Sequence, residues 1–498
     1  MSTSVHLGAH AHQETADGRR PFFILLGTVA ILFAVVLAYA ETRSFSWDEG
    51  FHVLAARLIQ SGQRPYLDFC FPQTPLNAYW NAFWVSIFGA SWRAIHAVAA
   101  LLVAGSVFLT ASFVSKRFPD PRWRLAGALA AACFVALNSS VVLFGPIGQA
   151  YAICLFLSVA AFRMTVVAVE RDTVWFAAGA GLLASAAAAS SLLTAPAVPV
   201  FLLWMLFYNR AGNRWTKLAA FVAGAVPPFF PVLWLFLKAP GVVWFNLVQY
   251  HLFFRRVRWE GATKHDIDVL LSWIDSSQAM LLGLLAIGGL LFTATASGWE
   301  RARRAEIYLS AGVAIMMSFE IGTAHPTFTW YFLLIVPFVA IPATVGFYAA
   351  GSRLYRPDRP IWPAAVLIVL LSLGLGKALH DDTESLTWGD MEAIAKKVQE
   401  VTPPDGTLWS SEHIYFLTHR PVPDGMEFQA GTKLDLTMAQ AAPLHILPRP
   451  ELDRRVKSGA YNTISNCDDD RIDELGLPKL YAHKQEIGSC SVFWGFKK

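Results

Sequence analysis

The chain has 498 residues, of which 55% are hydrophobic and only 15% carry a charge. Soluble proteins of ordinary composition contain about 25% charged residues. The deficit is concentrated in long apolar runs, which excludes an ordinary soluble enzyme and indicates that lipid is the solvent for most of the chain. The formal net charge is only +4, and no basic tract interleaved with aromatic residues occurs, so a nucleic-acid partner is excluded.

The first apolar run covers residues 21–40 and follows Arg19 and Arg20. It ends in Ala38-Tyr39-Ala40, which resembles a signal-peptidase site, so a cleaved signal peptide is one interpretation. The run of about 20 residues is longer than the usual signal-peptide core of about 7–15 residues, and it matches the thickness of a bilayer. We therefore expect a retained membrane anchor.

Further apolar runs bring the number of predicted membrane spans to eleven. One shorter stretch, 76–90, is ambiguous. Its apolar side chains recur at the spacing of an amphipathic helix, with Asn77 and Asn81 off the apolar stripe. Trp and Tyr are typical of the membrane surface, so we predict an interfacial helix there, preceded by another at 51–60. The other runs lie at about 94–115, 125–143, 147–169, 173–190, 193–208, 217–237, 276–296, 305–321, 329–350 and 360–378.

The distribution of Lys and Arg among the loops predicts the orientation of the chain. If the N-terminus is cytoplasmic and 76–90 does not span, the inside loops hold sixteen basic residues and the outside loops nine. If 76–90 did span, the counts would be about eight and seventeen, so the first arrangement satisfies the positive-inside rule. It places these segments outside the cytoplasm: 41–93, 144–148, 238–275, 322–328 and the chain after about 379.

Asp48 and Glu49 stand directly after the first predicted span and before the helix predicted at 51–60. Acidic residues are favoured at helix N-termini, so one interpretation is helix capping. The other is an active-site acid, because a carboxylate near the membrane surface can have a raised pKa and act as a general base. The sequence leaves both open.

Other outside segments carry candidate binding residues. Arg255, Arg256 and Arg258 oppose the general charge bias, and they are either an anchor to lipid headgroups or a clamp for a phosphate group. His325 is the one histidine of its turn, and such a residue is more often structural. Gln149 begins a span and is expected to face the same side.

These residues resemble the C-type membrane glycosyltransferase superfamily (GT-C), in the branches that contain the dolichyl-phosphate-mannose protein mannosyltransferases and the bacterial aminoarabinose transferases. The features that carry the resemblance are an acidic pair after the first span, two interfacial helices, a stretch leading into the next span, and a late turn motif. In this chain they are Asp48-Glu49, 51–60 with 76–90, Phe88-Gly89-Ala90-Ser91-Trp92-Arg93, and His325 with Tyr331 and Pro337.

The resemblance implies transfer of a sugar from a polyprenyl-phosphate donor to a lipid, glycan or protein acceptor outside the cytoplasm, with inversion at the sugar. Asp48 would be the base, and Glu49 would tune or replace it. The arginines, His325, Tyr331 and Gln149 would bind the substrate. The implied location is a bacterial inner membrane, with the site facing the periplasm. No cofactor is certain. Many relatives have an acidic residue in the second outer loop, which this chain lacks, so a divalent metal stays open as an alternative that this loop does not support.

The composition changes sharply near residue 380 and predicts a small mixed domain. We expect a helix at 388–401 and short strands at 408–409, 414–417 and 491–496. Its role is either a structural cap over the cavity or recognition of the acceptor. If it lies outside the cytoplasm, Cys467 and Cys490 are a candidate disulfide.

The predicted fold is therefore an all-α polytopic membrane protein with a small α/β domain at its C-terminus. The segments are a cytoplasmic tail (1–20), a transmembrane region (21–379) and an extracytoplasmic domain (380–498). A transporter or lipid flippase is the alternative function, and a non-catalytic scaffold is a third. Many transporters show paired internal repeats and charged residues within their spans. This sequence shows no internal repeat and few charges within its spans, so it gives a transporter little support.

Overall fold

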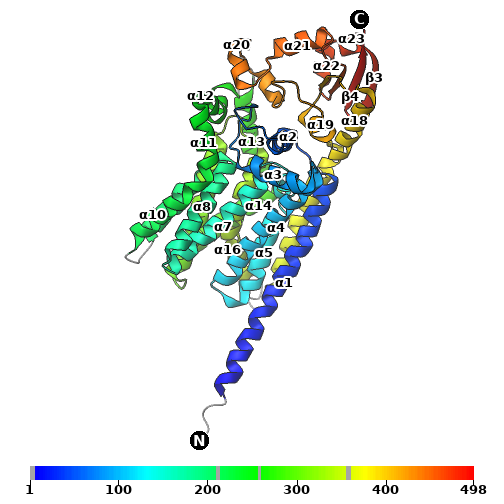
Figure 1. The fold of residues 1–498 in the computed structure, drawn as a ribbon. Coiled ribbons are helices and arrows are strands. Elements are labelled where there is room, and N and C mark those ends of the chain that lie inside the picture. The colour runs from blue at the N-terminus through cyan, green and yellow to red at the C-terminus, as the bar shows by residue number, and fades with distance from the viewer. Residues whose placement is uncertain (1–5, 209–212, 256–259, 355–359, 498) are drawn as a thin grey trace.

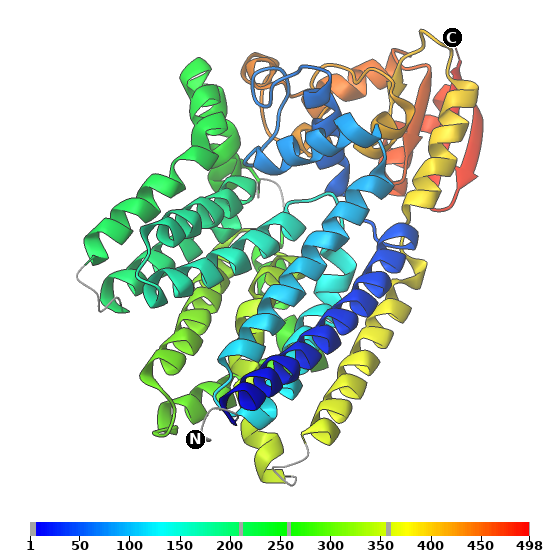
Figure 2. The ribbon, with the colours of Figure 1, turned by 60° about the horizontal axis from the view of Figure 1, so that its bottom comes forward.

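A computed structural model describes residues 6–208, 213–255, 260–354 and 360–497 of the chain. Long helices form a bundle, and a smaller mixed module covers one end of it (Figure 1). We call residues 382–497 the C-terminal module and the end it covers the module end. The first helix, α1 (His6–Thr42), begins far from the module and leads toward it, as a rotated view also shows (Figure 2).

Within the described residues, eight helical stretches are long and apolar enough to cross a membrane. Two shorter apolar helical stretches, 174–190 and 192–208, accompany them, so the protein is a multi-pass membrane protein. The long stretches are α1, α4 (Trp92–Arg117), α7 (Tyr151–Glu170), α10 with α11 (Arg214–Ala225 and Phe230–Lys238), α14 (Ser277–Thr295), α15 (Arg301–Thr323), η5 with α16 (Thr329–Ile335 and Val336–Leu354) and α17 (Ile361–Asp381). The shorter ones are α8 (Val174–Ser190) and η2 with α9 (Leu192–Thr194 and Ala197–Tyr208).

The remaining predicted span, 125–143, is the third in chain order, and it is divided into two helices. They are α5 (Arg124–Ala136) and α6 (Ser139–Phe144). The division falls at Asn138, whose side chain accepts a hydrogen bond from the backbone N–H of Val141 at 3.3 Å and so begins a new helix. Hydropathy alone does not register this polar cap.

The two helices predicted after the first span are present as α2 (Glu49–Gln60) and α3 (Leu76–Phe88). In α3 the polar face points inward. Asn77 and Asn81 are buried, and both donate hydrogen bonds to the carbonyl oxygen of Gly148, at 3.1 and 2.6 Å. Phe83 and Ile87 are each more than half exposed, which suits a surface that faces lipid rather than water.

The segment predicted as the loop 238–275 is largely helical. It contains α12 (Pro240–Trp244), the π-helix η4 (Phe245–Phe254) and α13 (Ala262–Asp275). Arg255 follows η4 directly, and it is the last described residue before the gap at 256–259. Arg256 and Arg258 therefore lie outside the described residues.

A four-stranded sheet forms the centre of the C-terminal module, in the order β1-β2-β4-β3. The first two strands are parallel, and the other neighbouring pairs are antiparallel. The strands are β1 (Leu408–Trp409), β2 (Thr463–Asn466), β3 (Tyr481–Ile487) and β4 (Cys490–Phe496). The helices around them are α18 (Trp388–Val401), α19 (Glu412–Thr418), α20 (Met438–Ala441), α21 (Arg449–Lys457), α22 (Asp469–Leu475) and α23 (Leu477–Leu480).

The strand predicted at 414–417 is wrong, because this run lies inside the helix α19. Ile414, Tyr415 and Phe416 are all buried, so the run has no polar face to reveal its period. The hydroxyl of Tyr415 donates to the carbonyl oxygen of Leu408 at 2.7 Å, which packs the helix against β1. The helix predicted at 388–401 is present as α18, with a capping box between Thr387 and Asp390.

A disulfide joins Cys467, just after β2, to Cys490 at the start of β4. It closes a loop with a sequence separation of 23 residues. A cross-link of this length stabilises a fold by about 3 kcal/mol, chiefly by restricting the unfolded chain.

We expect the double variant Cys467→Ser/Cys490→Ser to lower the unfolding free energy of the C-terminal module by about 3 kcal/mol. The loss is measured by thermal unfolding of the module under non-reducing conditions, with proteolysis used to detect the unfolded module. Cys133→Ser is the control, since Cys133 is a free cysteine buried in the bundle. Equal unfolding free energies of the double variant and the unaltered protein would contradict the expectation.

Candidate active site

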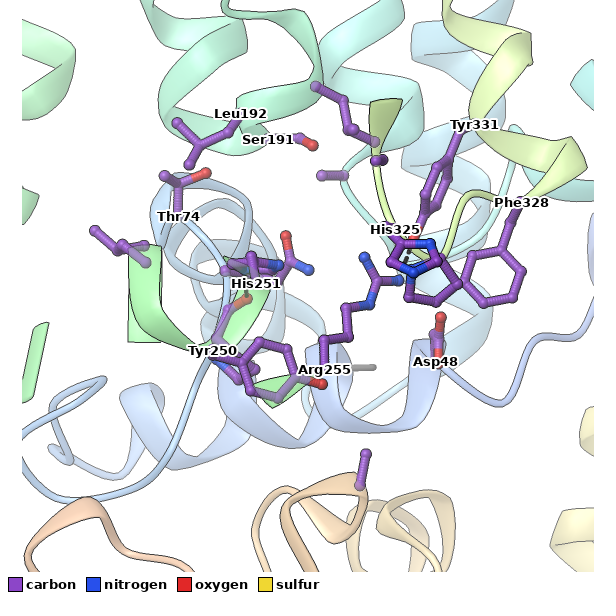
Figure 3. Close-up of a pocket in the computed structure, with 18 of the residues that line it drawn as sticks. Asp48, Thr74, Ser191, Leu192, Tyr250, His251, Arg255, His325, Phe328 and Tyr331 are labelled. Atoms are coloured by element: carbon purple, nitrogen blue, oxygen red, sulfur yellow. Dashed lines mark hydrogen bonds between the residues drawn. The ribbon is translucent and has the colours of Figure 1, made fainter. Parts of the chain in front are cut away.

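A cavity of about 810 Å³ opens at the module end, between the bundle and the C-terminal module. Asp48, Gln149, Arg255, His325 and Tyr331 all line it, although they come from segments far apart in the sequence. Most of them are drawn in Figure 3, where Arg255 extends into the space between Asp48 and Tyr331. The cavity thus gathers the described substrate-binding candidates together with the predicted base.

Asp48 is the N-cap residue of α2, but its side chain makes no capping hydrogen bond. The carboxylate is exposed to the cavity, while the surrounding protein shields it from bulk water. This burial raises the pKa of Asp48, and the positive charges of Arg255 and Lys433 partly oppose the rise. A carboxylate that is free of protein donors and has a raised pKa can accept a proton from a bound hydroxyl group.

Arg255 reaches the cavity from the end of η4. Its Nη2 donates to the hydroxyl oxygen of Tyr331 at 2.6 Å. The guanidinium carbon lies 5.6 Å from the ring centroid of Phe328 and 5.9 Å from that of Tyr331, so both aromatic rings contact the cation. A cation fixed in this way can bind an anionic group with its remaining N–H donors.

His325 lies in the turn between α15 and η5. Its Nδ1 forms an ion pair with the carboxylate of Asp266 on α13. The other oxygen of Asp266 accepts the backbone N–H of Thr327 at 2.8 Å. This double contact fastens the turn to α13, so His325 positions the wall that also carries Phe328 and Tyr331.

Gln149 is buried at the cavity wall. Its Nε2 donates to Oγ of Ser46 at 3.3 Å, two residues before Asp48. Its Oε1 has no hydrogen-bond partner among the described residues, and neither does Nδ1 of His52, which also lines the cavity. Buried polar atoms normally have partners, so these two are candidates for contact with water or substrate.

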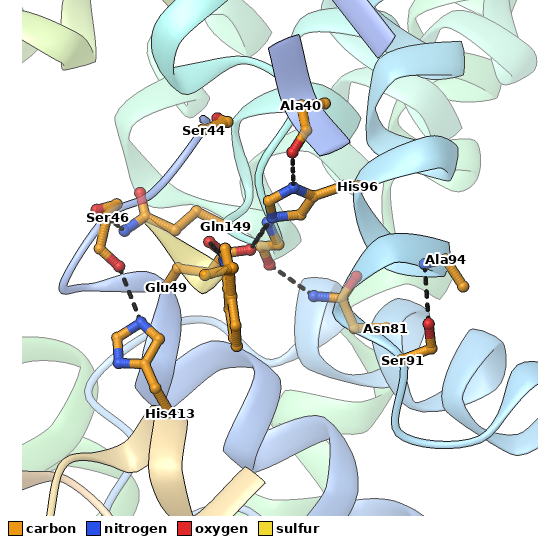
Figure 4. Close-up of polar contacts among 12 residues, drawn as sticks. Ala40, Ser44, Ser46, Glu49, Asn81, Ser91, Ala94, His96, Gln149 and His413 are labelled. Carbon is orange, nitrogen blue, oxygen red and sulfur yellow. Dashed lines mark hydrogen bonds and ion pairs between the residues drawn. The ribbon is translucent and has the colours of Figure 1, made fainter. Parts of the chain in front are cut away.

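Glu49 does not line the cavity, although it is adjacent to Asp48. Its carboxylate is fully buried and accepts hydrogen bonds from the backbone N–H of Gly148 at 2.6 Å and from Nε1 of Trp388 at 3.0 Å. It also lies 2.7 Å from Nε2 of His96, whose Nδ1 is 2.8 Å from the carbonyl oxygen of Ala40 (Figure 4). Both ring nitrogens of His96 face acceptors, which suits a doubly protonated, positively charged ring.

The environment of Glu49 favours its charged form. Burial by itself would raise the pKa of the carboxyl group, but His96 and the hydrogen bonds from Gly148 and Trp388 outweigh it, so the net shift is downward. Glu49 therefore joins α2 to α1, to α4, to the turn before α7 and to the C-terminal module. Its contacts assign it to positioning these elements.

The C-terminal module has further contacts with the bundle. Arg57 on α2 donates to the carbonyl oxygens of Tyr415 at 2.5 Å and Arg420 at 3.2 Å. At the edge of the interface, Arg93 forms an ion pair with Glu392, with Nη1 and Oε1 2.5 Å apart. These contacts hold the module over the cavity.

Sequence reasoning missed several residues of the site. His52 and His251 line the cavity from α2 and η4, Lys433 lines it from the C-terminal module, and Asp266 supports the turn of His325. His52 could have been found, because it follows Asp48 by four residues and so shares its face of α2. Lys433 has no local signal, since only the docking of the module brings it to the cavity. Among the described residues, no group of three or more His, Cys, Asp or Glu is placed to hold a metal ion.

We expect Glu49→Gln to lower the unfolding free energy by about 3 kcal/mol, because it leaves the charged partner of a buried pair uncompensated. The native carboxyl has a depressed pKa, so its stabilisation is present above the unfolded value of about 4.3 and is lost as the pH falls toward the folded value. Thermal unfolding in detergent between pH 3 and pH 7 measures both effects. Glu400→Gln is the control, since Glu400 is an exposed partner of Lys397.

If Glu49→Gln unfolds at the same temperature as the unaltered protein across this pH range, the positioning role of Glu49 is contradicted. We expect Glu49→Gln to unfold at a lower temperature than the unaltered protein at neutral pH. Below pH 5, the unfolding temperature of the variant should depend less on pH than that of the unaltered protein.

No protein-family model matches the chain, and no curated protein matches it in sequence. Solved structures do match. ArnT from Cupriavidus metallidurans bound to undecaprenyl phosphate has a TM-score of 0.63 at 13% identity, over 95% of this chain and 97% of that one. The apo state of ArnT gives 0.64 at 12% identity, over 96% and 98%.

The Archaeoglobus fulgidus oligosaccharyltransferase in its apo form is also similar, with a TM-score of 0.51 at 13% identity. This likeness covers 82% of the present chain and 65% of the oligosaccharyltransferase. Likeness at such low identity establishes architecture. The chain therefore has the overall fold of ArnT and of this oligosaccharyltransferase, which is the fold that the resemblance in the sequence predicted.

Proposed function

We propose that the protein is a membrane glycosyltransferase that transfers a sugar from a polyprenyl-phosphate donor to an acceptor outside the cytoplasm. The observation that carries this proposal is the meeting of Asp48 and Arg255 in one cavity. Among the described residues, Asp48 accepts no hydrogen bond from a side chain and Arg255 has no carboxylate ion pair, so both are open to a substrate with a phosphate leaving group.

The cavity suits a donor with a lipid tail and a phosphate. Leu192, Leu193, Leu247 and Leu252 supply apolar lining beside the polar residues. Leu252, on η4, is more than half exposed, so the apolar part of the lining is open there to a lipid tail. The binding of undecaprenyl phosphate by ArnT, which shares this fold, supports a polyprenyl-phosphate carrier here.

In the proposed reaction, the acceptor hydroxyl or amine attacks the anomeric carbon of the sugar as Asp48 takes its proton. The bond between that carbon and the phosphate oxygen breaks, and the electron pair leaves with the phosphate. Arg255 and the hydroxyl of Tyr331 stabilise the negative charge that develops there. Direct attack on the side opposite the phosphate inverts the anomeric configuration.

Glu49 acts in this proposal through position. It fixes the first turn of α2 against Gly148 and Trp388, and so holds Asp48 at the cavity wall. This role replaces the direct tuning of the base that the neighbouring position in the sequence suggests.

We place the cavity on the periplasmic or exterior side of a bacterial inner membrane. Basic residues gather at the end of the bundle away from the module. They include Lys116 and Arg117 in the last turn of α4, Arg124 at the start of α5, and Arg301 and Arg303 at the start of α15. The positive-inside rule favours a cytoplasmic position for that end. A disulfide in the C-terminal module supports an oxidising compartment for the other.

The purified protein is expected to transfer labelled sugar from a polyprenyl-phosphate donor, and Asp48→Asn to reduce the rate by about 10²–10⁴-fold. The base works as the carboxylate, so the rate falls as the pH drops through the raised pKa of Asp48, above the ordinary value near 3.9. Transfer kinetics with a panel of lipid-linked sugars between pH 4 and pH 9 test this.

Asp68→Asn is the matched control, because Asp68 lies in the same segment but pairs with Arg64 and does not line the cavity. Full activity of Asp48→Asn would show that another group is the base. Movement of intact lipid-linked sugar across vesicles, without any transfer, would favour a flippase instead.

We expect Arg255→Met to lower kcat/KM by about 10²–10³-fold, because the variant loses a preorganised cation at the leaving group. Arg255→Lys should recover part of the rate, since it keeps the charge but loses the planar arrangement that meets Tyr331. Steady-state kinetics measure both variants, and Lys264→Met on the exposed face of α13 is the control. Unchanged kinetics in Arg255→Met would remove Arg255 from the site.

A further inference from the structure

One segment of the C-terminal module forms part of the cavity wall. We call residues 428–434 the capping segment, of which Phe428, Ala430, Lys433 and Leu434 line the cavity. The ring of Phe428 lies edge-on to Phe51 of α2 at 5.2 Å and to Tyr250 of η4 at 5.6 Å between centroids. These contacts fix the segment against the two elements that carry Asp48 and Arg255.

The capping segment is also held from within the module. The backbone N–H of Gln429 donates to Oε1 of Glu412 at 2.7 Å, and the Gln429 side chain donates to the carbonyl oxygen of Ser410. Residues 429–433 then form the short helix η7, which ends at Lys433. A rigid base for this lysine is therefore part of the module's own fold.

Lys433 brings a positive charge to the cavity. Its side chain is exposed to the cavity, and it has no ion pair with a carboxylate among the described residues. It is close enough to lower the pKa of Asp48, as Arg255 does. Among the described residues, the cavity therefore holds two cations without a carboxylate ion pair, Arg255 from η4 and Lys433 from the module.

We propose that Lys433 binds the phosphate of the polyprenyl carrier together with Arg255, an inference that rests on the proposed function. A phosphodiester donor carries one negative charge. When the bond to the sugar breaks and the electron pair stays on oxygen, the product is a phosphate monoester whose charge approaches −2 near neutral pH. The second cation matches the charge that appears only as the bond breaks.

The two cations differ in a way that suits this division. Arg255 lies beside two aromatic rings, is hydrogen-bonded to Tyr331, and has a planar guanidinium group that presents its donors in one plane. Lys433 is a compact charge on a flexible stem with three donors, and it can follow an oxygen as it changes its charge. The C-terminal module is thus a part of the binding site, and its capping segment recognises the donor phosphate.

Binding of undecaprenyl phosphate to the full-length protein in detergent tests the proposal directly. We expect Lys433→Met to weaken binding by about tenfold or more, the loss of one charge-assisted hydrogen bond. Lys433→Arg, which keeps the charge, should bind within about threefold of the unaltered protein. Lys457→Met is the matched control, since Lys457 is an exposed lysine of the same module outside the cavity.

Equal binding by Lys433→Met and the unaltered protein would overturn the role of Lys433 while leaving the proposed function in place. Absence of undecaprenyl phosphate binding to the unaltered protein would overturn both. Phosphatidylglycerol in the same detergent is the comparison lipid. If it binds as tightly and loses the same factor in Lys433→Met, the site is a general headgroup site and the proposal fails.

Kinetics give a readout that a structural role would not move. Lys433→Met should lower kcat as well as raise KM, because the charge it balances grows during the reaction. Its thermal unfolding temperature should match that of Lys457→Met. A variant with unaltered kcat and KM would overturn the proposal.

Discussion

The buried carboxylate of Glu49 is the interaction on which the arrangement of the site depends. A charge in the interior is costly unless it is paired and hydrogen-bonded, and here His96, Gly148 and Trp388 supply the partners. These partners come from a span, from a turn and from the C-terminal module. The three partners couple these elements at one point, and undocking of the module would remove the hydrogen bond from Trp388 and open the buried pair of Glu49 and His96 to solvent.

Asp48 and Glu49 show how one peptide bond can separate two chemistries. At the start of α2 the chain turns so that Glu49 enters the protein interior and Asp48 faces the cavity. The pKa of Glu49 is lowered by His96 and by hydrogen-bond donors, whereas the pKa of Asp48 is raised by burial. Two carboxylates in opposite environments are a common means of separating a structural charge from a reactive one.

The sequence predicted most of the spans, because hydropathy can be read along the chain. The charge of the loops predicted that Asp48, Arg255 and His325 lie on one side of the membrane, and the roles of these residues stay predictions. Loops on one side of a bundle are confined to a small area, which brings Asp48, Arg255 and His325 together. Lys433 could not be predicted, because its position depends on how the module docks. The helix at 414–417 was mistaken for a strand for a related reason, since a run buried on every side shows no period.

The outward-facing apolar residues of α3 bear on how a substrate could arrive. Phe83 and Ile87 are exposed, while Asn77 and Asn81 reach inward to the Gly148 turn beside Glu49. Under the proposed function this face lies at the lipid boundary, and α3 would then hold the cavity near the headgroups. A lipid-borne substrate would then enter sideways from the membrane plane, so its supply is governed by surface density and lateral diffusion rather than by its concentration in water.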